Sequence, residues 1–305
     1  MAMIKVENRD IKISNPEKML WPELEIRKID YITTLIKLSP YILPYSSNRL
    51  LTTIRYPDGV AGKYFYQKSI PKYAPPWIDK FYWHDTAYIV LNCLSTLVWL
   101  GNQAALELHI SFNSYHEEDN PSHVVIDLDP SKDQPFEEVI EAALLINEIL
   151  TSLGIKSWAK TSGATGLQIY IPTAGVYDYP TSRKINEFLS KYFSQKYPSL
   201  FTIERVVNKR GKKLYFDYLQ MWYGKTITAP YSPRATPWAT ISTPIEWKEL
   251  KKGLTPRDFT LLNIMDRLEK KGDLFKQMAF SDNTPSLDNI LSHLGQSTKT
   301  PKPLP

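Results

Sequence analysis

Hydrophobic and polar positions alternate most clearly in the middle of the chain, where four elements follow one another. After a short apolar strand that ends at a proline, apolar side chains return every three or four residues, which is the period of one helix face. A glycine that can end this helix follows, and then come two strands joined by a tight loop. The spacing predicts these elements over residues 124–130, 136–153, 158–161 and 167–171, with the loop over 162–166.

The flanking regions carry weaker patterns of the same kinds. We expect strands at Ile11–Ile13, Leu50–Arg55, Tyr64–Tyr66 and Lys213–Tyr218, and helices at Lys28–Leu38 and from Thr181 to about Tyr197. The turn at Tyr56–Gly59 predicts a hairpin, and three prolines between residues 70 and 80 predict an extended loop. The apolar run Ile89–Leu100 can continue as a helix through Gly101–Glu107. Strands interleaved with helices predict a mixed α/β (α+β) fold.

The chain has 305 residues, which is enough for one large domain or two modules that share a core. We expect one folded unit over residues 1–280, with an N-terminal part over about 1–110 and a second part over about 111–280. From residue 281 to 305 the chain becomes a polar tail or linker, and its last seven residues are rich in proline and lysine.

Composition and charge narrow the classes of protein. The formal charge is +5, which is compatible with a polyanionic partner without requiring one. The single cysteine, Cys93, excludes an internal disulfide and a multi-cysteine zinc site. The polar start and the lack of an 18-residue apolar run predict a cytoplasmic protein without a membrane span.

Two aspartates stand at the end of the central strand. Asp127 and Asp129 are separated by one residue, so their side chains leave the same face of a strand, about 6.5–7 Å apart. Val124, Ile126 and Leu128 are expected to point the other way, into apolar packing. Asp217 ends another apolar strand. Neighbouring carboxylates repel one another and lose hydration, and a divalent cation relieves both penalties. Three carboxylates on adjacent strand ends can hold two cations, although Asp127 and Asp129 can also cap a helix or form a surface turn.

The loop Ser162–Gly166 contains two glycines and two hydroxyl side chains. Its glycines let the backbone approach an anion, and its N–H groups can wrap phosphate oxygens. It is not a Walker loop, because no Gly-Lys-Ser/Thr follows. A glycine hairpin can equally be only a turn. Beside three aspartates, however, the loop has the composition needed to hold a triphosphate.

Basic side chains occur near these motifs. Arg210 belongs to a cluster of basic residues just before the strand that ends at Asp217, and most of this cluster is expected to lie at the solvent-exposed surface. Arg234 follows a proline-containing turn and can contact a phosphate through two nitrogens, or simply lie at the surface. His109 ends a short apolar segment and, alone, reads more readily as a structural histidine than as a ligand.

The motifs occur in an order that resembles a known family. Nine of them resemble the polymerase domain of bacterial and archaeal ATP-dependent DNA ligase D, in the archaeo-eukaryotic primase superfamily. They are Asn15–Lys18, Arg55–Gly59, Phe65–Lys68, Ala74–Trp77, Ala105–His109, Val125–Pro130, Lys160–Leu167, Phe216–Gln220 and Thr226–Arg234. The resemblance extends over about residues 5–280, and nine motifs in series are far more specific than any one of them.

The resemblance implies a primase-like fold and a set of roles. Two divalent cations, manganese or magnesium, would bind Asp127, Asp129 and Asp217. The implied nucleotide contacts are His109, Ser162, Gly163, Thr165, Gln168, Arg210, Gln220 and Arg234. The implied contacts to the DNA 5′-phosphate and template are Asn15, Lys18, Lys28, Phe65, Tyr66 and Lys68. The family fills gaps in non-homologous end joining, commonly prefers ribonucleotides, and has Ku and a DNA ligase as partners.

Two positions depart from the family pattern, and other functions stay open. Gln168 stands where the family usually has histidine, and an amide cannot carry a proton or a positive charge. Ser69 stands where family members usually have another histidine. A non-catalytic module that binds DNA 5′-phosphate ends is therefore one alternative to a polymerase. A metal-dependent glycosyltransferase is another, because an Asp-x-Asp motif also holds nucleotide-sugar diphosphates.

Overall fold

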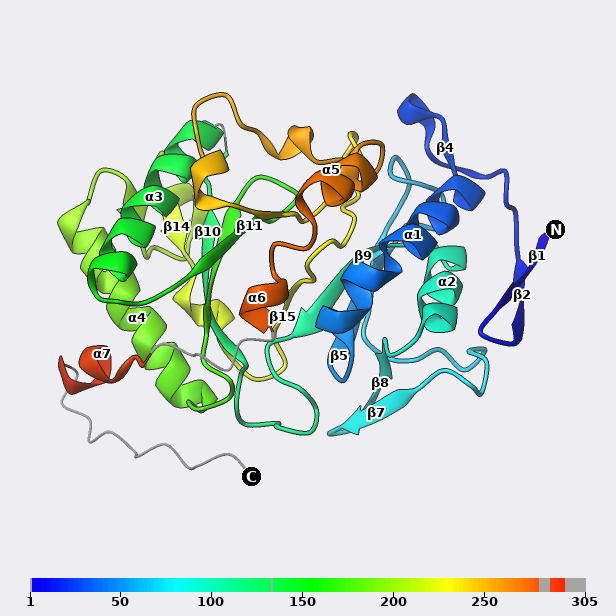
Figure 1. The fold of residues 1–305 in the computed structure, drawn as a ribbon, viewed down its shortest axis with the longest axis horizontal. Helices are drawn as coiled ribbons and strands as arrows, with labels where there is room; N and C mark the ends of the chain where they lie inside the picture. The colour runs from blue at the N-terminus through cyan, green and yellow to red at the C-terminus, as the bar shows by residue number, and fades with distance from the viewer. Residues whose placement is uncertain (1, 133, 280–285, 294–305) are drawn as a thin grey trace.

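The architecture consists of two six-stranded sheets that face each other (Figure 1). A computed structural model describes residues 2–132, 134–279 and 286–293. The first sheet has the order β15-β9-β5-β8-β7, with β6 also paired to β5. Its strands are β5 (Leu50–Arg55), β6 (Phe65–Gln67), β7 (Lys80–Trp83), β8 (Thr86–Val90), β9 (Ala105–Ser111) and β15 (Thr226–Thr228).

The second sheet has the order β13-β14-β10-β12-β11-β16. Its strands are β10 (His123–Asp129), β11 (Trp158–Thr161), β12 (Leu167–Pro172), β13 (Phe201–Thr202), β14 (Leu214–Phe216) and β16 (Pro244–Ile245). Because β10 and β12 lie at its centre, the aspartate strand and the strand after the glycine loop are direct neighbours. The mixed α/β architecture is as predicted.

Helices cover the outer faces of both sheets (Figure 1). The helices are α1 (Lys28–Ser46), α2 (Leu94–Asn102), α3 (Phe136–Ser152), α4 (Tyr179–Lys196), α5 (Ile264–Lys271), α6 (Lys276–Ala279) and α7 (Asp288–His293). The first two belong with the first sheet, and α3 and α4 with the second. Two small hairpins precede α1, made by β1 (Ala2–Val6) with β2 (Arg9–Ile13) and by β3 (Met19–Trp21) with β4 (Ile26–Arg27).

Strand β10 divides its side chains between two cores. Val124, Ile126 and Leu128 lie in the core beneath α3 and α4. Val125 lies in the other core, which includes residues of the first sheet. Successive side chains of a strand point to opposite faces, so the intervening aspartates face the groove between the two sheets.

Two element boundaries in the N-terminal half differ from the sequence predictions. Gly101–Glu107 does not continue a helix, because α2 ends at Asn102 and Ala104 adopts a left-handed φ of 53° before β9 begins. Helix α1 runs on to Ser46 through Pro40 and Pro44. Pro40 has no N–H to donate, and the hydroxyl of Ser39 donates instead to the carbonyl of Ile36 at 2.8 Å.

Two further boundaries concern the C-terminal half. Asp178, not Thr181, caps α4, since its carboxylate accepts the Thr181 N–H at 2.8 Å. Within the stretch expected to be a polar tail, α7 and the residue before it place Leu287, Ile290 and Leu291 in the core of the second sheet. The Pro/Lys-rich end lies outside the described residues.

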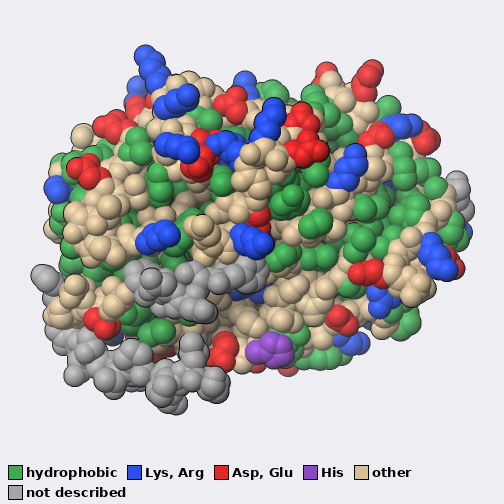
Figure 2. Space-filling view, in the orientation of Figure 1, with side chains coloured by type: hydrophobic (Ala, Val, Ile, Leu, Met, Phe, Trp, Pro, Cys, Tyr) green, Lys and Arg blue, Asp and Glu red, His purple; other side chains and the backbone are tan. Residues whose placement is uncertain are grey.

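The described helices include none that is long and apolar enough to cross a membrane. On the face shown in Figure 2, lysine and arginine side chains are interspersed with acidic ones. This mixture is in keeping with the small net charge of +5.

Candidate active site

The three predicted aspartates lie on neighbouring strands of the second sheet. In the register of β10 with β12, Asp127 stands opposite Gln168, and in its register with β14, Asp129 stands opposite Tyr215. The backbone N–H of Asp217, just after β14, donates to the carbonyl of Asp127 at 3.1 Å. The fold therefore brings residues 90 positions apart to the same sheet edge.

Burial and the neighbouring negative charges make Asp127 and Asp129 unusually weak acids. Burial raises the pKa of Asp127 to about 6, with contributions from the charges of Asp217 and Asp129, and against a hydrogen bond from Gln168. Burial also raises the pKa of Asp129, against the stabilising charge of Arg210. A cation placed among them would remove this penalty on the charged forms.

Each carboxylate also has a partner of its own. Gln168 Nε2 donates to Asp127 Oδ1 at 3.1 Å, and Arg210 Nη1 lies 3.2 Å from Asp129 Oδ2. Asp217 Oδ1 accepts from the Tyr215 hydroxyl and the Leu219 N–H, both at 3.1 Å. Accordingly, no group of three or more His, Cys, Asp or Glu side chains within the described ranges is gathered tightly enough to hold a metal. The donor chemistry fits hard cations, but the side chains would have to turn from their present partners.

The glycine loop is organised around Ser162. The N–H groups of Ala164 and Gly166 both donate to Ser162 Oγ, at 3.1 and 3.0 Å. These two N–H groups are thus directed into the loop and do not point outward as the sequence interpretation expected. No acceptor for the Ser162 hydroxyl hydrogen is found in the described part of the chain, so the hydroxyl can donate into the cleft.

The two glycines allow close packing against the rest of the site. A Cβ on Gly166 would lie 2.2 Å from the carbonyl oxygen of Leu128, between the two aspartates of β10. Gly163 has a φ of 73°, and a Cβ there would lie 2.7 Å from Cγ of Arg234. The glycines therefore fit the loop to strand β10 and to Arg234.

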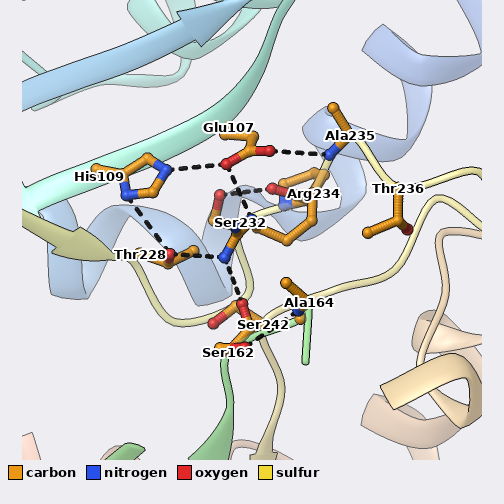
Figure 3. A network of polar contacts seen from close by, with 12 residues as sticks. Glu107, His109, Ser162, Ala164, Thr228, Ser232, Arg234, Ala235, Thr236 and Ser242 are labelled. Carbon is orange, nitrogen blue, oxygen red and sulfur yellow. Dashed lines mark hydrogen bonds and ion pairs between the residues drawn. The ribbon is translucent and has the colours of Figure 1, made fainter. Parts of the chain in front are cut away.

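A buried polar network joins the first sheet to this loop (Figure 3). Glu107 Oε2 lies 3.0 Å from His109 Nε2 and 2.9 Å from Arg234 Nε. Arg234 Nη1 donates to the Ser162 carbonyl at 2.7 Å and to Thr228 Oγ1 at 3.0 Å. Arg234 thus connects Glu107, on β9, to the loop of the second sheet.

A cleft of about 330 Å³ lies between the two sheets at this point. Its walls include eight of the predicted residues, which are His109, Asp127, Asp129, Ser162, Thr165, Gln168, Gln220 and Arg234. Arg210 adjoins the cleft through its ion pair with Asp129, and Asp217 through its backbone hydrogen bond to Asp127. Gly163 packs beneath Arg234. Acidic groups therefore face a hydroxyl-rich loop and an arginine across one cleft.

Gln168 and Lys160 are adjacent on paired strands and are both buried. Gln168 Oε1 is a buried atom without a hydrogen-bond partner in the described residues. Lys160 Nζ donates to the Ser242 hydroxyl, and burial lowers the pKa of Lys160 well below its ordinary value. Sequence reasoning missed Lys160, Glu107 and Tyr215 as parts of the site. The available signal was spacing, because these three residues lie two positions before Ser162, His109 and Asp217, respectively.

A second group of predicted residues lies around the N-terminal hairpins. Lys18 Nζ pairs with Asp58 at 2.7 Å, and Lys28 Nζ donates to the Ser14 carbonyl at 2.8 Å. Burial and the charges of Lys18 and Arg55 lower the pKa of Lys28. The N–H of Lys18 donates to the carbonyl of Asn15 at 3.0 Å. The two lysines and Asn15 are therefore close together, as a shared anion site requires.

The predicted aromatic platform is at the surface. Phe65 and Tyr66 on β6 are 44% and 66% exposed, and the guanidinium of Arg55 lies 5.1 Å from the centroid of the Phe65 ring. Lys68, just beyond β6, is also exposed. Exposed rings beside a basic group are available for base stacking.

A further cavity of about 320 Å³ lies in the same inter-sheet groove and shares Ile227 with the cleft. Its lining is mainly apolar, with Arg49, His123 and Tyr170 among the polar members. We place the chemistry in the first cleft because that cleft contains Asp127, Asp129 and the glycine loop.

Comparison with known proteins gives a consistent set of relatives. A family model described as LigD, primase-polymerase domain, matches residues 27–275. The bifunctional non-homologous end joining protein LigD of Bacillus subtilis is 37% identical over 285 residues, covering 93% of this chain and 46% of that protein. The multifunctional LigD of Mycolicibacterium smegmatis is 27% identical, over 97% of this chain and 39% of that protein. The chain thus spans less than half the length of these relatives.

A solved structure has the same fold. The polymerase domain of Mycobacterium tuberculosis ligase D, in complex with DNA, superposes with a TM-score of 0.81 at 25% identity. The match covers 90% of this chain and 99% of that domain. The predicted primase-polymerase architecture is therefore confirmed.

Proposed function

The chain belongs to the LigD primase-polymerase domain family, and from this premise we propose that it is a nucleotidyltransferase that extends DNA 3′ ends at gaps and breaks. The observation that supports this most directly is the cleft in which Asp127 and Asp129 face Ser162 and Arg234. Such a cleft can hold the two charged parts of the reaction, a triphosphate and the cations that neutralise it.

In this proposal, Asp127, Asp129 and Asp217 would hold two divalent cations, manganese or magnesium. Such a pair, when bound, supplies activation of the attacking 3′-hydroxyl and stabilisation of the pyrophosphate leaving group. Their carboxylates repel one another, which is the condition that cation binding relieves. Gln168 would keep Asp127 oriented by its hydrogen bond and cannot itself transfer a proton.

The remaining cleft residues would bind the nucleotide. The Ser162 hydroxyl, His109 and Arg234 reach the cleft from three different segments, so together they can orient a triphosphate and its sugar. Thr165 and Gln220 line the same walls. Arg210, stacked over Tyr215 at 3.8 Å and paired with Asp129, would contact phosphate as Asp129 turns toward a cation. We propose ribonucleotides as the preferred substrates on the family resemblance alone.

A separate surface would bind the downstream DNA strand. Lys18 and Lys28 would contact its 5′-phosphate, with Asn15 beside them, and Phe65 and Tyr66 would stack on template bases. Arg55 lies beside the exposed Phe65 ring and its charge acts on Lys28, so positive charge stands next to exposed rings, the combination that tracks a nucleic-acid strand. The proposed setting is non-homologous end joining, with Ku and a DNA ligase as partners.

Primer extension on a gapped duplex with a 5′-phosphate tests the catalytic part. With manganese present, the wild type should add nucleotides, whereas Asp217→Ala should lose incorporation and keep most DNA binding. Asp266→Ala, which removes an exposed aspartate on α5, is the matched control and should behave as the wild type.

The outcome also decides between a polymerase and a non-catalytic end-binding module. A folded wild-type protein that binds phosphorylated ends without incorporating nucleotides would favour the module. The feature behind this alternative is Gln168, the partner of Asp127, because its amide cannot transfer a proton. Substantial synthesis by Asp217→Ala would instead refute the assignment of the cation ligands.

A further inference from the structure

Glu107 lies behind the cleft and contacts two of the residues that line it, His109 and Arg234. It sits on β9 two residues before His109, so both side chains leave the same face of the strand. His109 and Arg234 line the cleft, whereas the Glu107 side chain is only 6% exposed and is turned toward them (Figure 3). Sequence reasoning gave Glu107 no role.

Three nitrogen atoms converge on the two oxygens of this carboxylate. Oε2 contacts His109 Nε2 at 3.0 Å and Arg234 Nε at 2.9 Å, the latter an ion pair without hydrogen-bond alignment. Oε1 accepts the backbone N–H of Ala235 at 3.2 Å. Every partner of Glu107 is thus a donor or a cation.

The charge of Glu107 fits this arrangement. Burial tends to raise the pKa of Glu107, but the hydrogen bond from His109 and the charge of Arg234 outweigh it and lower that pKa. Burial and the charge of Arg234 lower the pKa of His109. A neutral imidazole beside a carboxylate carries its hydrogen on the nitrogen that faces the carboxylate. His109 therefore donates from Nε2, and Nδ1 is left as an acceptor toward Thr228 Oγ1, 3.5 Å away.

We infer that Glu107 is a positioning residue, which fixes the tautomer of His109 and the orientation of Arg234 so that both present a defined surface to a nucleotide triphosphate. Glu107 acts through these residues and does not touch the ligand. The inference rests on the proposed function for the identity of the ligand, but its first consequence concerns the ligand-free protein.

An amide cannot replace this carboxylate without a conflict. A carboxylate only accepts hydrogen bonds, whereas glutamine has one accepting oxygen and one donating NH₂ group. If the oxygen of Glu107→Gln faces His109 and Arg234, its NH₂ faces the Ala235 N–H. If the amide is reversed, its NH₂ faces His109 and Arg234. Of the three partners, only His109 can change from donor to acceptor, by moving its hydrogen to Nδ1.

The ligand-free experiment is nitrogen-15 NMR of the imidazole rings. The chain has five histidines, and the spectrum of His109→Asn identifies the signals of His109. At pH 7 we expect the Nε2–H tautomer in the wild type and in Glu107→Asp, and a shift toward Nδ1–H in Glu107→Gln. Because one orientation of the amide keeps its oxygen toward His109, the inference is overturned if a folded Glu107→Gln protein shows neither a changed His109 tautomer nor a changed triphosphate affinity.

The matched control is Glu249→Gln. Glu249 also accepts from an arginine, Arg267, at 2.7 and 2.8 Å and from a backbone N–H at 2.8 Å, but it lies outside the cleft lining. Its replacement removes a comparable ion pair without reaching His109. We expect it to leave the His109 spectrum as in the wild type.

The ligand experiment measures binding of a non-hydrolysable nucleoside triphosphate with manganese. Hydrogen bonds to charged groups are worth enough to change affinity by about 10–100-fold, so Glu107→Gln should weaken binding by that factor. Glu249→Gln should bind as the wild type. Tighter binding by Glu107→Gln would show that the carboxylate only offsets positive charge, and would overturn the positioning role.

The two experiments fail separately. If the wild type binds no triphosphate, the proposed function is wrong while the tautomer result still decides what Glu107 does to His109. If binding occurs and Glu107→Gln alters neither tautomer nor affinity, only the positioning role is refuted. Where Glu107→Gln does not fold, Glu107→Asp decides, because a shorter carboxylate should keep the tautomer and lose part of the affinity.

Discussion

Replacing Gly166 by alanine tests how closely the glycine loop must approach the aspartate strand. The added Cβ would lie 2.2 Å from the carbonyl oxygen of Leu128 and 3.5 Å from Cδ of Pro130. The obstacle is backbone in the middle of a sheet, because Leu128 also pairs with Leu167 and Phe216 on the two neighbouring strands. Relief therefore requires the loop and β10 to separate by about 1 Å, given carbon–oxygen contacts of more than 3 Å.

The magnitude follows from this geometry. Overpacking a buried site costs about 1–3 kcal/mol, and a rigid neighbour favours the upper end. For a domain of this size, about 3 kcal/mol corresponds to a melting temperature lower by about 6–12 °C. A displacement of about 1 Å between groups that hold one substrate can lower the rate about 100-fold. We therefore expect Gly166→Ala to lose both stability and most of its nucleotide incorporation.

Gly154→Ala is the control that separates steric contact from backbone strain. Gly154 has a φ of 73° at the end of α3, but a Cβ there meets no atom within 4 Å. Alanine in this left-handed conformation costs about 1–2 kcal/mol without disturbing the cleft. Urea denaturation and primer extension of both variants would be compared. If Gly166→Ala is as stable as Gly154→Ala and fully active, the close approach to Leu128 does not matter and our reasoning is wrong.

The remaining predictions concern charge. Without metal, Asp127→Asn should stabilise the protein by up to about 3 kcal/mol above pH 6 and not below pH 4. The pKa of Asp127 is raised from its ordinary 3.8 to about 6 in the folded state, so the charged carboxylate destabilises the folded protein only at a pH where Asp127 is ionised. Equal free energies of unfolding of the two proteins, measured with urea at pH 7, would contradict this. Lys18→Ala with Lys28→Ala should weaken binding to 5′-phosphorylated gaps and flatten its salt dependence. Equal loss for unphosphorylated gaps, measured by fluorescence anisotropy, would place the phosphate site elsewhere.

The hydrophobic pattern of the sequence predicted which side chains of a single strand or helix face a core. The alternation along β10 predicted correctly that Val124 and Ile126 point into a core and that Asp127 points away from it. It failed over Gly101–Glu107, where an apolar run is equally compatible with a helix and with a buried strand. The left-handed residue Ala104, which separates the two elements, leaves no signal in hydrophobicity.

The parts of the site that sequence missed depend on contacts between distant segments. Glu107 contacts Arg234 across 127 positions, and no local pattern encodes that pairing. The Gly166 N–H donates to Ser162 Oγ, and the same glycine lies close to the backbone of β10. A glycine-rich sequence predicts that another group can come close to the backbone of the loop. It does not show whether that group is an anion or a neighbouring strand.

Arg234 joins groups that the two sheets contribute to the cleft. The second sheet contributes the carboxylates, Asp127 and Asp129, whereas His109 comes from the first sheet. The distance between acidic and donor groups is therefore set by how the sheets pack. Arg234 connects the two sheets at this point, because its guanidinium pairs with Glu107 of the first sheet and donates to Ser162 of the second. A substrate that contacts both the aspartates of the second sheet and His109 of the first would consequently bind most tightly when Arg234 keeps its contacts with Glu107 and Ser162.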